Sequence, residues 1–345
     1  MTYDEIAKLK CTEINSLPEN KIDEIIEVVI DYYYNRGFPY YPVDTEKIKK
    51  EYNYLLNFDI HSLELDNNHL QQNMNGLNTV NTFHPEMWSV RCKNSKTPME
   101  IYQDRNLFKN ALRKRIKYSD TKLVDFNIRK SLKAFGTQAV SNFRPTIAKW
   151  ACEKFVSPLG GGNVLDPCAG YGGRLMGALC SPINSYTGID PNKISIDGNL
   201  ALGKHIRSVA KEEPPWYLFL NIPFEDYDPI PSKKFDFIFT SPPYFDIEKY
   251  STDETQSYIR YKTYAKWVEK FLKVLIEKSN LLLRDNCYFA LNVAGKLIED
   301  TLCIGNNVFG KEPEVYYMRL SKMLGQSNKN DISHKTEPIF VWKKS

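Results

Sequence analysis

The pattern of hydrophobic and polar positions changes character near residue 139. From there onward, short runs rich in β-branched and aromatic residues alternate with longer segments whose apolar residues recur every three or four positions. This alternation predicts the strands of a parallel sheet with helices packed on both faces. Strands are predicted over residues 163–165, 186–190, 216–220, 235–240, 287–293, 314–320 and 337–342.

The segments between these strands complete a doubly wound α/β prediction. Too few residues separate the last two strands for a helix between them, so they are expected to pair as an antiparallel hairpin. The predicted fold is therefore a seven-stranded doubly wound sheet with an antiparallel terminal hairpin. Helices are predicted over residues 140–155, 173–180, 194–209 and 263–283.

Residues 1–138 are polar, rich in Asn and Lys, and mainly helical in pattern. Apolar residues recur at helical spacing over residues 22–33, and Gly37 with the following Phe-Pro ends that helix. Asp44 is positioned to cap a second helix, and a third is predicted over residues 106–116. The chain is thus expected to form a helical region over 1–138 and a sheet domain over 139–345.

Composition excludes several classes of protein. No apolar run approaches the roughly 20 residues that span a bilayer, and the N-terminus is acidic and polar, so no membrane segment or signal peptide is expected. The seven cysteines form no CxxC pair and the five histidines show no metal-ligand spacing, so no metal is expected. A soluble protein of the reducing cytoplasm is the resulting expectation.

The distribution of charge is more informative than its total. The formal net charge is only +4, but ten basic residues lie between Arg105 and Lys133, opposed by two acidic residues. Such a stretch is expected to bind phosphates by counterion release. The alternative is an ordinary solvated helical face. The candidate nucleic-acid-binding residues are Arg113, Lys114, Arg115 and Lys117.

A glycine-rich turn, VLDPCAGYGGR over residues 164–174, follows a predicted strand and opens a predicted helix. Glycines let the backbone approach a ligand, and ligands of such sheets bind beyond the carboxyl ends of the strands. The spacing is not GxGxxG, and no lysine stands where a phosphate loop needs one, which favours S-adenosylmethionine over a dinucleotide. A tight strand–helix connection is the alternative. Candidate cofactor-binding residues are Asp166, which would balance the methionine amino group, with Cys168, Ala169, Gly170 and Gly172.

Two further polar positions follow later strands. Asp190 ends the second strand, where an acidic side chain can accept hydrogen bonds from ribose hydroxyls, or simply cap the next helix. After the third strand, Phe224 is the candidate for stacking on adenine, and Glu225 or Asp226 for accepting its amino group. A core phenylalanine and solvated acids are the alternative at this third position.

The segment Ser241-Pro242-Pro243-Tyr244 ends the fourth predicted strand. Two prolines cannot continue a central strand, because each lacks a backbone donor, so they fix a rigid extended corner. Ser241 and the carbonyl of Pro242 can accept hydrogen bonds from a substrate amino group, and Tyr244 offers a face on which a flipped base can stack. These four residues are the candidate catalytic residues, acting mainly by positioning.

Together these motifs resemble those of the S-adenosylmethionine-dependent DNA amino-methyltransferases, which make N4-methylcytosine or N6-methyladenine. The turn at 164–174 is similar to their motif I, and Ser241–Tyr244 to their motif IV, [Ser/Asn/Asp]-Pro-Pro-[Tyr/Phe/Trp]. The segment Phe143-Arg144-Pro145 resembles motif X, which packs beside the methionine end of the cofactor. The resemblance covers residues 138–345 and implies a class I methyltransferase fold, and the Ser form of motif IV favours cytosine over adenine.

The chain also departs from that family. No substantial insertion lies inside the catalytic region to serve as a target-recognition domain, and residues 1–138 match no known DNA-binding motif. DNA is the expected partner. The alternatives are a methyltransferase acting on RNA or on a protein glutamine, a non-catalytic nucleic-acid-binding module, and base hypermodification with another donor.

Overall fold

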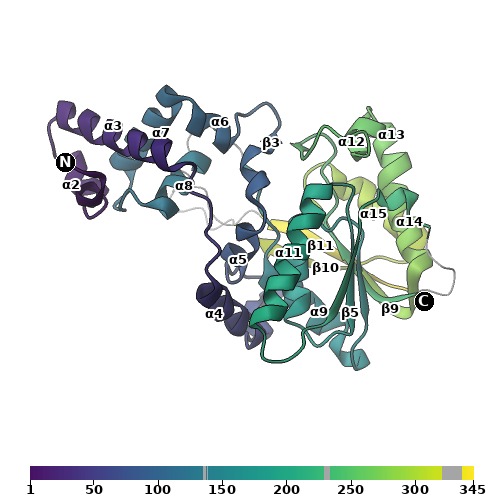
Figure 1. Ribbon diagram of the computed structural model, residues 1–345. Coiled ribbons are helices and arrows are strands. Elements are labelled where there is room, and N and C mark those ends of the chain that lie inside the picture. Colours follow the sequence, from purple (N-terminus) through teal and green to yellow (C-terminus); the bar gives the residue numbers. More distant parts are fainter. Residues whose placement is uncertain (135–136, 138, 229–233, 321–335) are drawn as a thin grey trace. The chain divides into compact units, whose positions relative to one another are not determined.

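A computed structural model describes residues 1–134, 137, 139–228, 234–320 and 336–345. The chain folds into two compact units (Figure 1). The second unit, which contains the sheet, is assembled from three separate stretches of sequence. The first unit comprises residues 1–42, 85–141 and 248–250, and the second comprises residues 43–84, 142–247 and 251–345.

The sheet of the second unit has the strand order β6-β5-β4-β7-β9-β11-β10, extended past β10 by two short strands. The first five of these strands are parallel, and β11 runs antiparallel to both β9 and β10. This order and terminal hairpin are those of the class I methyltransferase sheet, which confirms the predicted fold class. The strands are β4 (Asn163–Asp166), β5 (Ser185–Ile189), β6 (Trp216–Leu220), β7 (Phe235–Thr240), β9 (Leu283–Asn292), β10 (Glu314–Arg319) and β11 (Thr336–Lys343).

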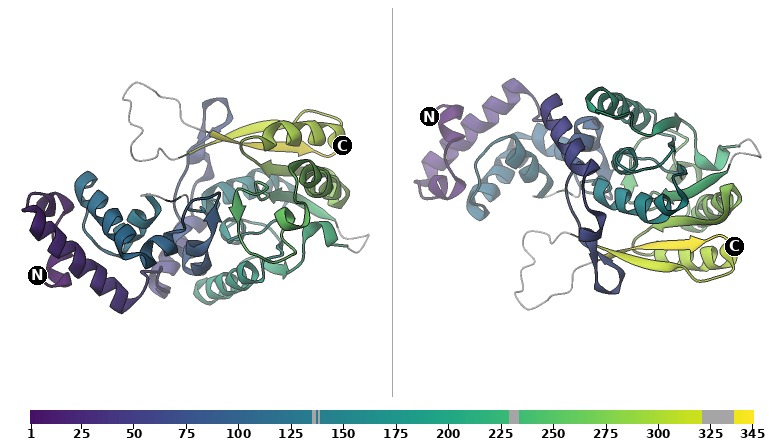
Figure 2. Two further views of the ribbon diagram at one scale, coloured as in Figure 1. Left: turned by 90° about the horizontal axis from the view of Figure 1, so that it is seen from above. Right: turned by 90° about the horizontal axis from the view of Figure 1, so that it is seen from below.

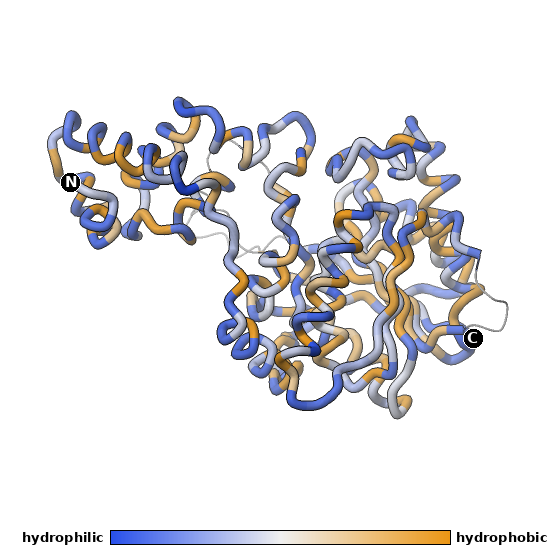
Figure 3. Tube along the Cα trace, in the orientation of Figure 1, coloured by the Kyte–Doolittle hydropathy of each residue, from blue (hydrophilic) through white to orange (hydrophobic). Residues whose placement is uncertain are grey.

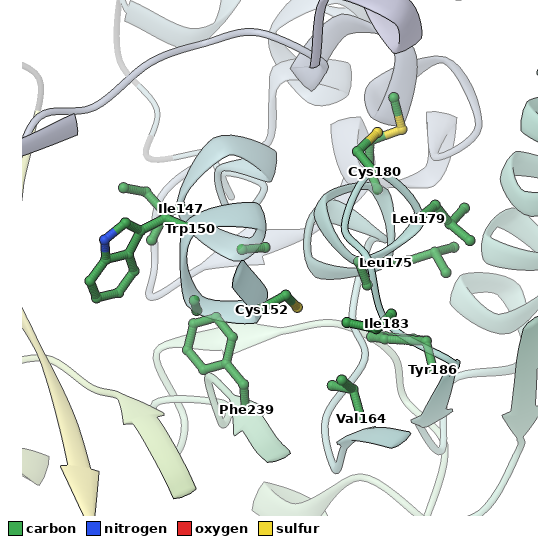
Figure 4. Close-up of a cluster of buried hydrophobic side chains, with 14 of the residues drawn as sticks. Ile147, Trp150, Cys152, Val164, Leu175, Leu179, Cys180, Ile183, Tyr186 and Phe239 are labelled. Atoms are coloured by element: carbon green, nitrogen blue, oxygen red, sulfur yellow. The ribbon is translucent and has the colours of Figure 1, made fainter. Parts of the chain in front are cut away.

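Successive side chains of the central strands enter two different hydrophobic cores, one on each face of the sheet. Val164 and Phe237 belong to one core, whereas their neighbours Leu165 and Ile238 belong to the other. Adjacent residues of a strand point to opposite faces, so a sheet covered on both sides needs continuous apolar runs. Figure 3 shows these runs as orange segments in the strands. Figure 4 shows the first core, where Val164 lies beneath two helices.

Helices cover both faces of the sheet (Figures 1 and 2). The segment predicted as one helix over 263–283 contains a π-helical turn, η6 (Val268–Leu272), between α13 (Tyr264–Trp267) and α14. The face of Val164 is covered by α9 (Pro145–Phe155), α10 (Gly173–Leu179) and α11 (Lys193–Val209). The opposite face is covered by α14 (Lys273–Leu282) and α15 (Leu297–Phe309).

Helices α9 and α10 approach each other closely because two glycines line their contact. A Cβ atom added to Gly173 would lie 2.1 Å from the carbonyl oxygen of Phe143. One added to Gly177 would lie 2.5 Å from the carbonyl oxygen of Pro145. Neither position has room for a side chain, so the glycine-rich turn and the segment resembling motif X fit together only as this sequence has them.

Residues 43–84 belong with the sheet, which corrects the predicted boundary between 138 and 139; residue 138 itself lies outside the described residues. Helix α4 (Thr45–Leu56) is capped by Asp44 as predicted, and its apolar face joins the core of Val164. Strand β2 (His69–Leu70) pairs with β10. The other elements of this segment are η1 (Ile60–Leu63), β1 (Glu64–Leu65), η2 (Asp66–Asn68) and α5 (Leu77–Thr82).

The first unit is mainly helical and has its own hydrophobic core. Its two longest helices are α3 (Glu19–Arg36), which ends at Gly37 as predicted, and α7 (Arg105–Tyr118). None of the described helices is both long and apolar enough to cross a membrane. The remaining elements are α1 (Tyr3–Ile6), α2 (Cys11–Asn15), η3 (Pro85–Ser89), α6 (Pro98–Gln103), α8 (Asp125–Ala134), and β3 (Arg91–Cys92) paired with β8 (Glu248–Lys249).

Candidate active site

The glycine-rich turn lies between the end of β4 and the start of α10. Gly170 and Gly172 have φ angles of +54° and +76°, which residues with a side chain rarely adopt. The nearest atom to a Cβ added at Gly170 would be the Cys168 carbonyl oxygen, 3.8 Å away, so this side of the turn is open. The Ala169 N–H donates to the carbonyl of Ile189, at the end of β5, with a distance of 2.9 Å. The turn is therefore fixed by the sheet, with an open glycine at its apex.

Asp166, the last residue of β4, is completely buried and joins four elements. Its Oδ2 accepts hydrogen bonds from Arg174 Nε at 2.7 Å and from the Tyr186 hydroxyl at 2.6 Å. Its Oδ1 accepts from Thr240 Oγ1 at 2.8 Å. The carboxylate expected to face the methionine amino group thus has internal partners, and it acts here as the hub that aligns β4, β5, β7 and α10.

Asp190 follows β5 and is partly exposed. Its Oδ2 accepts a hydrogen bond from the Gly170 N–H at 2.9 Å, and its Oδ1 accepts one from the Asn192 N–H at 2.8 Å. Desolvation raises the pKa of this carboxyl to about 6. Each carboxylate oxygen has a second acceptor direction, so Asp190 can receive hydroxyl donors beside the glycine-rich turn.

Strand β7, which carries the Ser-Pro-Pro-Tyr segment, is hydrogen-bonded directly to β4. Its last residue, Thr240, is fully buried and bonds to the glycine-rich turn. Thr240 Oγ1 accepts from the Cys168 N–H at 3.1 Å while donating to Asp166. Ser241 is the next residue, so the Thr240 hydroxyl fixes the start of the Ser-Pro-Pro-Tyr corner against the glycine-rich turn.

The corner continues into Phe245, whose φ of +58° is unusual for a bulky residue. Its ring is buried and makes edge contacts with Tyr264 and Trp267, at centroid distances of 5.7 and 6.0 Å. The Lys296 ammonium lies 5.3 Å from the centre of the same ring. These contacts hold an uncommon backbone conformation directly after Tyr244, which is the kind of local strain found at functional sites.

Pro242 is buried, whereas Ser241, Pro243 and Tyr244 are partly exposed. The two prolines fix the backbone of the corner, Thr240 anchors its start and Phe245 its end. The four predicted residues therefore form one rigid segment at the carboxyl end of a central strand, where ligands of such sheets bind.

The segment resembling motif X reaches the glycine-rich turn through Arg174. The guanidinium of Arg174 lies 5.3 Å from the ring centre of Phe143 and also donates to the carbonyl of Cys168. Arg144 donates to the Asn142 carbonyl at 2.9 Å, and Pro145 occupies the first turn of α9. The structure thus brings Phe143 and Cys168 to the same side chain.

The residues after β6 are arranged differently from expectation. Phe224, in the turn η5 (Phe224–Asp226), is 2% exposed and packs in the core with Tyr227, so its ring has no open face for adenine. Glu225 is nearly buried, and burial raises its pKa, while Arg260 Nη1 lies 3.1 Å from its Oε1. Ile222, two residues after β6, is half-buried, as is Leu220 at the end of that strand, so apolar side chains of this region remain partly open.

The four predicted nucleic-acid-binding residues fall into two pairs. Arg113 is ion-paired with Glu19 and Asp23 of α3, and Arg115 is 4% exposed with its Nε donating to Ser131 at 2.9 Å. Lys114 and Lys117 are exposed on α7. Helix α7 therefore presents part of its predicted positive charge to solvent and holds the rest inside the first unit.

The ion pairs of Arg113 belong to a regular, partly exposed ladder between α3 and α7. Acidic residues at every fourth position of α3 face basic residues at every fourth position of α7, with nitrogen–oxygen distances from 2.6 to 2.9 Å in the Arg105–Glu27, Arg105–Asp31 and Lys109–Glu27 pairs. Residues four apart lie on one face of a helix, so the two stripes meet along their length. This ladder pairs Arg105, Lys109 and Arg113, three of the ten basic residues of the stretch. The sequence offered two interpretations of these basic residues, a phosphate-binding site and a solvated helical face. Pairing with a second helix is a third arrangement.

Among the described residues, no group of three or more His, Cys, Asp or Glu side chains converges as metal ligands would. The cysteines in these ranges are all free thiols. Burial raises the pKa of the Cys168 thiol well above its ordinary value, so this cysteine is protonated and unreactive at neutral pH.

Comparison with known proteins identifies no family by sequence: no family model matches the chain, and no curated protein does. Several solved methyltransferase structures are similar in fold. The N-methyltransferase NodS of Bradyrhizobium japonicum matches 57% of this chain and 93% of its own, at 10% identity and a TM-score of 0.36. The tRNA methyltransferase TrmI of Aquifex aeolicus matches 59% of this chain and 70% of its own, at 13% identity and a TM-score of 0.38.

A third similar structure is the T. thermophilus 16S rRNA methyltransferase RsmC in complex with AdoMet and guanosine. It matches 61% of this chain at 15% identity and a TM-score of 0.37, and the match spans 46% of its own length. Likeness at this level carries no argument about activity. The fold assignment of the second unit rests on its own strand order and register.

Proposed function

We propose that the protein is an S-adenosylmethionine-dependent methyltransferase that modifies the exocyclic amino group of a base in DNA, with N4-cytosine favoured over N6-adenine. The observation that carries this proposal is the pair of hydrogen bonds made by the Thr240 hydroxyl. This hydroxyl accepts from the N–H of Cys168 in the glycine-rich turn and donates to Asp166. It joins a cofactor-type turn on β4 to a Ser-Pro-Pro-Tyr corner on the neighbouring strand. The segment proposed to bind the methyl donor and the segment proposed to bind the target base are thereby fixed beside each other, at the carboxyl ends of two neighbouring central strands.

The residues at the turn fit the methionine and ribose portions of the cofactor. The open side of Gly170 permits close approach of a ligand to the backbone, and Asp190 beside it has acceptor capacity for two ribose hydroxyls. Cys168 and Ala169 complete this wall, and Gly172 shapes the turn. When bound, the cofactor supplies an electrophilic methyl group on a sulfonium. Ile222 and Glu225 are the side chains we assign to the adenine end.

The Ser241 hydroxyl and the Pro242 carbonyl act as acceptors for the two hydrogens of the target amino group. Holding those hydrogens orients the nitrogen lone pair toward the methyl donor, so the contribution to rate is positional. The target nitrogen gains the methyl group as the sulfur–carbon bond breaks, and it then loses one of its hydrogens as a proton to solvent. Tyr244 supports the base, flipped out of its helix, by stacking. The neutral thiol of Cys168 is no nucleophile, which agrees with direct transfer to nitrogen without a covalent enzyme–base intermediate.

Lys114 and Lys117 are the residues of the basic stretch that we assign to phosphate contacts, because they are exposed. Arg113 and Arg115 contribute instead to the stability of the first unit.

The deciding experiment is identification of the methylated product. Purified protein is incubated with methyl-labelled S-adenosylmethionine and unmethylated duplex DNA, which is then digested to nucleosides for mass spectrometry. Labelled N4-methylcytosine or N6-methyladenine supports the proposal and fixes the base. Label found only in RNA, or only on protein glutamine, would move the substrate to that class, and a protein that binds no cofactor would refute the proposal.

Cofactor affinity is expected to depend on pH through Asp190. Its pKa of about 6 means that the ionised carboxylate, the better acceptor of hydroxyl donors, is lost as the pH falls through 6. If only this form binds ribose, affinity at pH 5 is about tenfold weaker than at pH 7. Calorimetric titration with S-adenosylhomocysteine at several pH values measures this. The Asp190→Asn variant should bind weakly at every pH, and a wild-type affinity independent of pH would contradict the assignment.

Ionisation of Asp190 is expected to have opposite effects on cofactor affinity and on the free energy of unfolding. Because the pKa of Asp190 in the folded protein lies above its ordinary value of 3.8, the folded state binds more protons than the unfolded chain between about pH 4 and 6. This carboxyl therefore lowers the free energy of unfolding as the pH rises through that window. Weaker binding at low pH thus cannot be attributed to loss of folding at this residue.

A further inference from the structure

Gly170, at the apex of the glycine-rich turn, has hydrogen bonds to both of its backbone polar groups, the N–H and the carbonyl. Its N–H donates to Asp190 Oδ2 at 2.9 Å. Its carbonyl accepts a hydrogen bond from Asn199 Nδ2, also at 2.9 Å. Asn199 lies in α11, one helix away from the turn in sequence, and is completely buried.

Asn199 is itself oriented by a buried histidine. Its Oδ1 lies 3.2 Å from Nε2 of His84, and His84 is completely buried too. Because the Asn199 amide nitrogen donates to Gly170, its oxygen is the acceptor, which places the proton of this contact on His84 Nε2. With the amide turned by 180°, its oxygen would face the Gly170 carbonyl oxygen and its nitrogen would face the protonated His84 Nε2, and both contacts would be repulsive. His84 fixes the productive orientation.

The packing around these groups leaves no room for another arrangement. A Cβ added to Gly172 would lie 2.4 Å from Asn199 Oδ1, and one added to Gly198 would lie 2.5 Å from the His84 ring. Two glycines are therefore required for the asparagine and the histidine to reach the turn. Buried polar side chains are tolerated where they are hydrogen-bonded, and here those hydrogen bonds lead to the backbone of Gly170.

From this geometry we infer that Asn199 is a positioning residue for the methyl donor, and that His84 acts through it. The inference rests on the proposed function, since it assigns Gly170 and Asp190 to the cofactor. Asn199 holds the Gly170 carbonyl while Asp190 holds its N–H, so the two peptide planes that meet at the Gly170 Cα are both fixed before the cofactor binds. The hydrogen bond from Asn199 to Gly170 also keeps Asp190 aligned for ribose, because Gly170 is bonded to both side chains. Pre-organisation of this kind reduces the conformational cost of binding.

The test is the Asn199→Ala variant, studied as the full chain. The dissociation constant of S-adenosylhomocysteine is expected to rise about tenfold, the equivalent of one hydrogen bond of ordinary strength. In steady-state assays KM for S-adenosylmethionine should rise by a similar factor, while kcat and KM for DNA stay within about twofold. A residue that only stabilises the fold would not separate these constants.

Asn292→Ala is the matched control. Asn292 is 2% exposed and its Nδ2 donates to a backbone carbonyl, that of Pro338, at 3.0 Å, so the substitution removes the same kind of bond away from the turn. It should lower the thermal midpoint like Asn199→Ala but leave cofactor affinity unchanged. If Asn199→Ala does not fold, Asn199→Leu keeps a similar volume and removes the donor without adding a buried charge, and the same rise is expected.

Two outcomes separate this inference from the function beneath it. Wild-type protein that binds S-adenosylhomocysteine, with folded Asn199 variants that bind it equally well, would overturn the positioning role and leave the proposed function intact. Wild-type protein that does not bind S-adenosylhomocysteine at all would overturn the proposed function itself.

Discussion

Replacing Ser241 by alanine is expected to lower kcat about 100-fold while the affinity for S-adenosylhomocysteine stays within about twofold. Ser241 is partly exposed at the end of β7 and stands next to Thr240, whose hydroxyl bonds to the glycine-rich turn. The proposed role assigns its own hydroxyl to the target amino group. Removing one preorganised acceptor leaves that nitrogen poorly oriented toward the methyl group, and costs rate without disturbing the cofactor side.

Single-turnover kinetics with duplex DNA, together with calorimetry, measure the two effects separately. Ser185→Ala is a suitable control, because Ser185 bonds to Asn163 at the opposite, amino end of the parallel strands. It should leave both constants unchanged. Equal losses of turnover and cofactor affinity in Ser241→Ala would show that the serine supports the cofactor site instead of holding the substrate.

The central strands of the sheet were predictable because they are apolar runs that are buried on both faces. Phe235–Thr240 is buried at every position, and the predicted span matches the observed one. Helix α15 was not predicted, since Gly305 and two asparagines weaken its helical pattern. Gly305 is explained only by tertiary structure: a Cβ there would lie 2.3 Å from the Trp342 ring.

The boundary between the units was not predictable from composition. Residues 43–84 share the polar, Asn-rich character of the N-terminal region, yet α4 and β2 pack with the sheet. A short strand such as His69–Leu70 has no periodicity of its own and forms because β10 offers it an edge. Long-range pairing of this kind leaves no local signal.

The candidate site was predictable where backbone chemistry dominates and less so where side-chain partners decide. Glycines with positive φ and two consecutive prolines impose their conformation on any structure that contains them. Whether Phe224 faces a ligand or the core, by contrast, depends on neighbours that the chain brings from elsewhere. Asn199 did leave a signal, as a polar residue three positions from Ile196 and from Leu202 within the apolar stripe of a predicted helix.

The charge ladder of the first unit also had a signal in the sequence. Glu19, Asp23, Glu27 and Asp31 recur every four residues, as do Arg105, Lys109 and Arg113. Two such stripes of opposite sign predict paired helices as readily as a phosphate-binding surface. Counting charges within one segment overlooked the complementary segment about 80 residues earlier.

Substitution of Asp166 by alanine is expected to lower the free energy of unfolding by about 3–5 kcal/mol, because it leaves Arg174 as an uncompensated buried charge. Arg174 is 6% exposed, and Asp166 also holds the hydroxyls of Tyr186 and Thr240. Urea denaturation followed by circular dichroism measures the change.

The exposed pair Lys193–Asp197 provides the matched control, since its side chains are 65% and 55% exposed and Asp197→Ala should have an effect below about 0.5 kcal/mol. A second comparison distinguishes charge from packing. If the unpaired guanidinium is the cause, adding Arg174→Met to Asp166→Ala should recover much of the loss, because replacement of a whole buried pair by apolar groups costs far less than removal of one partner. A double variant no more stable than Asp166→Ala would instead assign the loss to the hydroxyl bonds of Tyr186 and Thr240.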